Sequence, residues 1–132
     1  MTINSPRISP RNEYLLQENL RVEASRTLAK EFPDLKSMTV DLGFYDLEGR
    51  LCRSQIKYKV NLEHARSVFR FGCENPECVR GGYDLSDVVS KAVKNRSSSV
   101  SGDLSCRGWR SRTTINDIPC GKVLRYSITL GY

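Results

Sequence analysis

The sequence predicts an α+β fold, in which one domain combines an antiparallel sheet of about five strands with two helices. The chain has 132 residues, a length that is typical of a single domain. Several short segments alternate apolar and polar residues, which is the pattern of strands with one buried face. Two other segments repeat apolar residues every three or four positions, as amphipathic helices do. Short connections between these segments favour antiparallel pairing.

The N-terminal part is expected to be a disordered tail followed by a helix. Residues 1–10 contain two prolines and mostly polar residues, so they have little to bury. The folded domain is therefore expected to span residues 11–132. Within residues 12–32 the apolar positions recur with a spacing of four, which places them along one helix face, and Pro33 discourages continuation. These positions are Leu16, Leu20, Ala24, Leu28 and Phe32.

A hairpin is predicted next. Residues 38–45 alternate strictly, which indicates a strand with Met38, Val40, Leu42 and Phe44 on its buried face. The segment DLEGR at 46–50 supplies the turn, where Gly49 is free to adopt a positive φ. The returning strand also alternates. Its apolar-face residues are Cys52, Ser54, Ile56, Tyr58 and Val60.

The second half of the chain is predicted to contain three strands and one helix. The strands are expected at 66–72, 98–106 and 122–132. Between the first two, residues 83–96 carry the clearest helical spacing in the chain, with Asp84 as the expected N-cap. The helix apolar residues are Leu85, Val88, Val89, Ala92 and Val93.

Four cysteines fall at the predicted strand ends. Cys73 and Cys78 follow the third strand with a C-x4-C spacing, and Cys106 and Cys120 bound the connection between the last two strands. If those two strands pair, both of these thiols lie at the same end of the sheet. Four thiolates at about 2.3 Å from a common centre form a tetrahedral zinc site. The spacing therefore predicts a structural Zn²⁺ bound by all four cysteines.

Residues 66–132 resemble a zinc ribbon, in which a knuckle after a strand and a later strand pair carry the ligands. Three features depart from that pattern: the spacing of four in the first pair, the inserted helix, and the long second loop. The resemblance implies a structural metal. A site filled by four thiolates is also closed, whereas catalytic zinc keeps a position for water.

Other readings of the cysteines stay open. The four thiols could be unrelated buried residues, and an iron–sulfur cluster also uses four thiolates. Disulfides are disfavoured because the polar N-terminus has no secretion signal. Cys52 is expected to be a core thiol. His64, the one histidine, is expected to be an exposed loop residue, although it could replace a cysteine ligand.

The charge pattern points to an acidic partner. The net charge is +6, and residues 79–132 carry nine Lys or Arg against four Asp, which gives +5. A solubilising surface is the alternative explanation. The loop between Cys106 and Cys120 combines arginine with the one tryptophan, a combination that can contact phosphate while the ring stacks on a base. The candidate residues are Arg107, Trp109, Arg110, Arg112, Lys122 and Arg125.

We therefore expect a cytoplasmic zinc-binding module that contacts nucleic acid, or alternatively an acidic protein or another copy of itself through an edge strand. No segment has the roughly 18 apolar residues needed to span a bilayer, so no membrane partner is expected. An enzyme is disfavoured, since a Cys52–His64 pair is the one nucleophile–base combination that the sequence offers.

Overall fold

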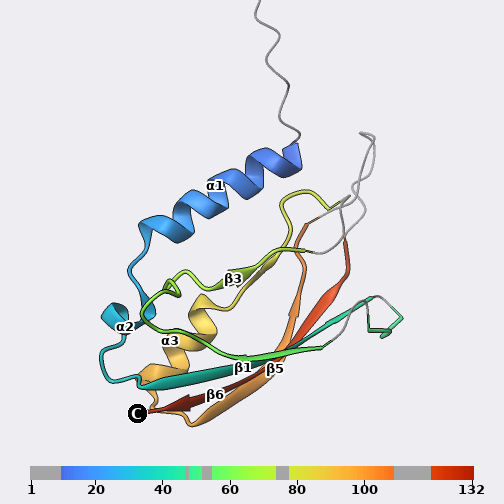
Figure 1. Cartoon of the computed structure of the whole chain (residues 1–132). Helices are drawn as coiled ribbons and strands as arrows, with labels where there is room; N and C mark the ends of the chain where they lie inside the picture. Colours follow the sequence, from blue (N-terminus) through green and yellow to red (C-terminus); the bar gives the residue numbers. More distant parts are fainter. Residues whose placement is uncertain (1–9, 47, 52–54, 74–77, 109–119) are drawn as a thin grey trace, which may run out of the picture.

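The structure is a computed structural model that describes residues 10–46, 48–51, 55–73, 78–108 and 120–132. Within these ranges the fold is α+β, as predicted (Figure 1). The predicted sheet of about five strands is corrected to two sheets, one of four antiparallel strands in the order β2-β1-β6-β5 and one formed by β3 and β4. The elements are α1 (Pro10–Ala24), α2 (Leu28–Glu31), β1 (Ser37–Tyr45), β2 (Ile56–Lys59), β3 (Arg70–Phe71), β4 (Tyr83–Asp84), α3 (Ser86–Lys94), β5 (Ser99–Ser105) and β6 (Val123–Gly131).

The centre of the large sheet is the pair β1 and β6, which stays in register from Ser37↔Gly131 to Tyr45↔Val123. The strict alternation of β1 places every second side chain on the inner face, where helices can cover it. Four of these side chains have no exposed area: Met38, Val40, Leu42 and Phe44. Burial of each such side chain contributes about 1.5–3 kcal/mol before the entropy cost. The predicted buried face of this strand is confirmed.

Helix α3 lies on the inner face of the large sheet (Figure 1). Its buried residues Val89 and Ala92 join the core, together with Leu85 just before the helix. The expected N-cap is wrong by one position, because Leu85 holds the N-cap and has no side-chain capping bond. Asp84 still accepts hydrogen bonds from the backbone N–H and hydroxyl of Ser86, so it helps to start the helix.

The single helix predicted over 12–32 is wrong, because α1 ends at Ala24 and α2 begins at Leu28. Two polar side chains satisfy the backbone where the helix breaks. The Ser25 hydroxyl donates to the Val22 carbonyl and accepts from the Val68 N–H, and the Thr27 side chain accepts from Lys30 N–H at the start of α2. Serine and threonine compete with helical hydrogen bonds in this way.

Helix α1 lies apart from the sheet (Figure 1), and its predicted buried face is wrong. Leu16 is 52% exposed and Leu20 is 61% exposed. The helix instead turns Tyr14 and Glu18 toward the rest of the protein, and both are half-buried. A regular spacing of apolar residues therefore identified the helix but not the side that packs.

The hairpin after β1 is confirmed, whereas the burial expected for its second strand is only partly right. Gly49 has φ +78°, and the Asp46 N–H donates to the Arg50 carbonyl across the turn. β2 is an edge strand, so Ile56 and Tyr58 are 36% and 38% exposed although they share a face with the core residues of β1. Cys52 lies outside the described residues.

The third predicted strand, 66–72, is much shorter than expected. Only Arg70–Phe71 is a strand, and it pairs with Tyr83–Asp84. This two-residue ladder brings the chain before Cys73 beside the chain after Cys78. It therefore positions the first cysteine pair near the end of β5 and the start of β6. No helix in the described part of the chain is long and apolar enough to cross a membrane.

Candidate metal centre

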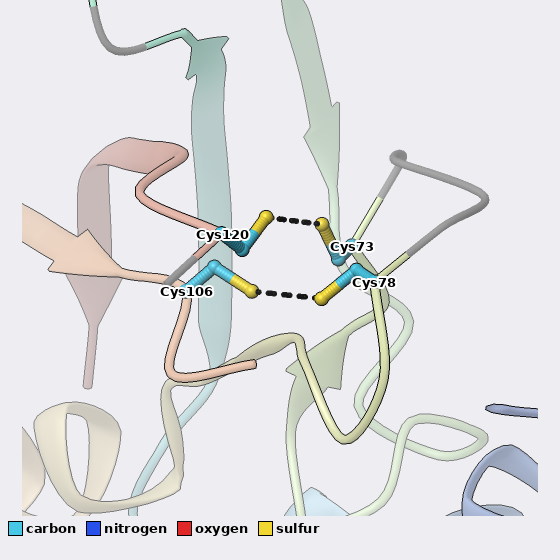
Figure 2. A group of neighbouring side chains, drawn as sticks. All are labelled: Cys73, Cys78, Cys106 and Cys120. Atoms are coloured by element: carbon cyan, nitrogen blue, oxygen red, sulfur yellow. Dashed lines mark hydrogen bonds between the residues drawn. The ribbon is translucent and has the colours of Figure 1, made fainter. Parts of the chain in front are cut away.

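The four predicted cysteines converge on one point. Their Sγ atoms all lie within 4.8 Å of one another, and Figure 2 shows them facing a common centre. The Sγ atoms of Cys73 and Cys120 are 3.6 Å apart, as are those of Cys78 and Cys106. All four residues are buried. The predicted ligand set is thus confirmed as a cluster that could hold a metal ion.

Two backbone segments carry the cluster. One is the connection between β3 and β4, which holds Cys73 and Cys78 and which we call the first cysteine turn. The other continues the β5–β6 ladder beyond its last strand pair, because Cys106 N–H donates to the Lys122 carbonyl and Cys120 N–H donates to the Gly108 carbonyl. Alternation along β5 sends Cys106 to the same face as Leu104, and Cys120 lies three residues before the start of β6. The predicted meeting of both thiols at one sheet end is confirmed.

The sulfur spacing fits a tetrahedral metal ion. Four thiolates at about 2.3 Å from a zinc ion lie about 3.8 Å from one another. A disulfide would require two sulfurs at about 2.05 Å, whereas the Cys73–Cys120 and Cys78–Cys106 sulfurs are 3.6 Å apart and none of the four cysteines forms a disulfide. The cluster therefore has the dimensions of a tetrathiolate site and not those of two disulfides.

Glycine backbone packs directly against the sulfurs. A Cβ at Gly81 would collide with the Sγ of Cys78 and lie 2.6 Å from that of Cys106. A Cβ at Gly108 would collide with the Sγ of Cys78 and lie 2.6 Å from the Val79 carbonyl oxygen. Gly72, beside the cluster in sequence, has open space around its Cβ position. Gly81 and Gly108 are thus required by the close approach of backbone to sulfur.

The site favours a thiolate at Cys106. A hydrogen bond from the Cys73 thiol is the largest cause that lowers the pKa of Cys106 to about 5, and backbone N–H groups of Gly108 and Gly82 add to it against the cost of burial. The Gly82 nitrogen lies 3.4 Å from this sulfur. Burial, followed by the neighbouring Cys106 sulfur, raises the pKa of Cys78 to about 12. Because thiols lose their protons when they bind a metal ion, such an ion would have to displace a proton from Cys78.

Two arginines brace the first cysteine turn from outside. The Arg11 guanidinium of α1 donates to the Cys73 carbonyl at 3.1 Å, and that of Arg70 donates to the Gly81 carbonyl at 3.0 Å. Four thiolates and one divalent ion would carry a net charge of −2, so nearby cations would also stabilise such a site electrostatically. Hydrogen bonds of this kind orient the ligands of metal sites.

The other predicted site residues are not gathered at one place. Arg107 is exposed next to Cys106, and Lys122 is half-buried. Arg125 lies on the sheet face away from the core, where it pairs with Asp103 at 3.6 Å and covers the Tyr45 ring at 4.8 Å. Trp109, Arg110 and Arg112 lie outside the described residues.

The histidine alternative is not supported. His64 is exposed on a turn and does not belong to the cysteine cluster in the described part of the chain. Sequence reasoning also missed two residues beside the cluster, Gly108 and Arg80. Their positions in the sequence could have indicated them, because Gly108 lies two residues after Cys106 and Arg80 lies two residues after Cys78.

The chain matches no protein-family model, and no curated protein or solved structure shows significant similarity to it. The similarity of residues 66–132 to a zinc ribbon thus rests on motif alone. The function has to be argued from the cysteine cluster and its surroundings.

Proposed function

We propose that this protein is a small binding module stabilised by one structural zinc ion, with Cys73, Cys78, Cys106 and Cys120 as thiolate ligands. The observation that supports this proposal most strongly is the burial of four sulfurs at tetrahedral spacing against glycine backbone. Soft thiolate ligands select zinc or iron–sulfur clusters over hard cations such as Mg²⁺. Zinc is preferred here because four sulfurs at this spacing can all bind one ion.

The proposed zinc has a structural role, and we propose no catalytic activity. Four thiolates leave no coordination position for a water or a substrate. The ion would instead join the first cysteine turn to the end of the β5–β6 ladder. The β3–β4 ladder within the first of these segments has only two residue pairs, so the ion would add to its attachment to the larger sheet.

We propose nucleic acid as the partner. Arg107 supports this choice because it is exposed and follows a zinc ligand directly, so its backbone is fixed by the metal and by the Cys106 N–H bond to Lys122. The net charge of +6 favours a polyanion. The roles expected for Trp109, Arg110 and Arg112 stay predictions of the same kind.

A fluorescence anisotropy titration with a labelled single-stranded oligonucleotide tests the partner. We expect binding that weakens steeply between about 50 and 200 mM salt. The slope of the logarithm of the association constant against the logarithm of the salt concentration should be about −0.7 for each phosphate contact. Arg107→Ala should weaken it, whereas Lys91→Ala, an exposed cation on α3, should not. Absence of binding at low salt would reject the nucleic-acid partner and leave the zinc proposal to be judged by metal analysis.

A protein partner is the second candidate, and the exposed side of α1 favours it. Leu16 and Leu20 lie one turn apart and are more than half exposed. β5 also forms an edge of the large sheet in the described residues, which allows strand addition. Retention of a partner after nuclease treatment, lost in a Leu16→Ser Leu20→Ser double variant, would favour this candidate over nucleic acid.

A further inference from the structure

A groove lies between α1 and the cysteine cluster. Its volume is about 560 Å³, within the roughly 300–1,000 Å³ that small-molecule sites occupy. Its walls come from α1, from the segment after Cys78, from the start of α3 and from the end of β5. Because one wall holds Arg80 and another holds Arg107, the groove brings together residues from both metal-binding segments.

The charges along the groove are unevenly neutralised. Four arginines and three carboxylates line it. Arg21 is paired with Glu18 at 2.7 Å and with Asp84 at 3.1 Å. Arg70 is also occupied, because it donates to the Gly81 carbonyl and lies over the Tyr14 ring at 5.8 Å. The α1 end of the groove is therefore close to neutral.

Two arginines at the metal end remain available. Arg80 and Arg107 are exposed, and neither forms an ion pair with any residue that the structure describes. The third carboxylate, Asp87, belongs to the first turn of α3, where the helix N-terminus favours its negative charge. The metal end of the groove thus presents two guanidinium groups to a ligand.

The backbone at Arg80 adds to this interpretation. Arg80 has φ +56°, a left-handed conformation that costs a side-chain-bearing residue about 1–2 kcal/mol. Glycine would adopt it freely, and Gly81 and Gly82 follow directly in the sequence. Strained residues of this kind concentrate at functional sites. An arginine at this position keeps a guanidinium at the groove at a cost in stability.

We propose that this groove is a phosphate-binding site in which Arg80 and Arg107 contact the anion. Arginine matches phosphate because its planar guanidinium forms two parallel hydrogen bonds to the oxygens. The groove has room for one nucleotide. This inference rests on the proposed nucleic-acid partner for the phosphodiester form of the ligand, whereas a phosphate monoester such as AMP would use the same arginines.

The test uses the metal-loaded full chain and three variants. Arg80→Gly removes the guanidinium and relieves the positive φ, so it is expected to be at least as stable as the parent. Arg107→Ala removes the second guanidinium, and Lys91→Ala is the matched control, since Lys91 is exposed and does not line the groove. Equal metal content and equal melting temperature would show that the variants retain the fold.

We expect Arg80→Gly and Arg107→Ala each to weaken oligonucleotide binding about tenfold. Each should also lower the salt slope by about 0.7, because one phosphate contact is lost. Lys91→Ala should change neither quantity. If the Arg80→Gly Arg107→Ala double variant binds the oligonucleotide as tightly as the parent does, the groove proposal is wrong while the nucleic-acid proposal survives.

A second titration separates the two proposals when no oligonucleotide binds. Inorganic phosphate and AMP are added at millimolar concentration while the amide resonances of Gly81 and Gly82 are followed by NMR. Shifts in the parent that disappear in the double variant would support a phosphate monoester site and reject nucleic acid as partner. Absence of shifts in the parent would overturn the groove proposal. If the arginines only balance the charge of the thiolates, the variants would bind zinc more weakly and leave both titrations unchanged.

Discussion

In the middle of the large sheet, β1 and β6 pair along their full length and bury Val40, Leu42 and Ile128 completely. At the cysteine end, β3 and β4 are two residues long, and four cysteines and closely packed glycines occupy the interior. The first region is stabilised by apolar burial, which a chain of this length can supply alone. The second buries Tyr83 and the four cysteines in the same core, but its own ladder is only two residue pairs long. From this comparison we propose that the metal would stabilise one end of the protein more than the rest of it.

Removal of the metal ligand Cys106 is expected to have the largest effect. Cys106→Ser should abolish tight metal binding and release the first cysteine turn from β5, because structural zinc contributes about 10–16 kcal/mol in small sites. Amide hydrogen exchange at Gly81, Gly82 and Tyr83 should accelerate by more than about 100-fold. Amides of β1 and β6 should stay protected. Equal loss of protection in both regions would contradict the separation of the two regions.

A core substitution should produce the opposite pattern. Phe44 has no exposed area and packs edge-on against Tyr83 at 5.7 Å. Phe44→Ala is expected to lower the free energy of unfolding by about 3–5 kcal/mol, as cavities from phenylalanine do. Chemical denaturation measures this loss, and the folded fraction should still bind one metal ion per chain. Loss of metal from folded protein would show that the core and the cysteine end are more tightly coupled than we propose.

The glycine packing gives a smaller and more local effect. Gly108→Ala adds a Cβ that meets the Cys78 sulfur, so it should weaken metal binding by roughly 10–100-fold, the range for changes beside metal ligands. Competition with a chromophoric chelator measures the affinity. Gly72→Ala is the matched control because its Cβ would meet open space. Similar affinities in the two variants would mean that backbone contact with sulfur does not matter.

The attachment of α1 is expected to be the weakest of these interactions. Burial tends to raise the pKa of Asp84, but hydrogen bonds from Ser86 and from Arg21 lower it overall. The contribution of this carboxylate is therefore fully present above its unfolded pKa of about 3.9 and is lost as the pH falls through the lower folded value. NMR signals of α1 should report release of the helix below about pH 4.

Arg21→Ala should release α1 at neutral pH with a cost below about 1 kcal/mol per ion pair, since both partners are partly exposed. Arg26→Ala, which removes an ion pair with Glu31 near α2, is the control. Unchanged α1 signals in Arg21→Ala would show that Arg11 and the Tyr14–Arg70 contact are sufficient to hold the helix.

Strand alternation predicted the sheet well, because β1 keeps one face fully buried and β6 buries Leu124, Ile128 and Leu130 on the same side. It also placed Cys106 on the face of Leu104, and the pairing of the last two strands placed Cys106 and Cys120 at the same end of the sheet. The site could therefore be predicted from strand ends and spacing. Strand patterns alone could not bring Cys73 and Cys78 close to Cys106 and Cys120, because that proximity depends on tertiary packing. The structure does place the four sulfurs together, as predicted.

The errors arose where burial depends on what covers a face. Leu16 and Leu20 follow a helical period, but no described segment packs on their side of α1. Ile56 and Tyr58 share a face with β1 core residues, yet they lie on an edge strand. The break between α1 and α2 was signalled by Ser25 and Thr27, whose side chains bond to nearby backbone groups. The spacing of apolar residues identifies the apolar face of a helix or strand, whereas tertiary contacts determine whether that face is buried.

The central claim is that four thiolates hold one zinc ion. Elemental mass spectrometry of protein purified without added metal, with X-ray absorption at the zinc edge, tests it most directly. The account predicts one zinc per chain with four sulfur neighbours at about 2.3 Å. It also predicts that four of the five thiols resist modification until a chelator and denaturant are added. Protein without metal and with five freely reacting thiols would contradict it.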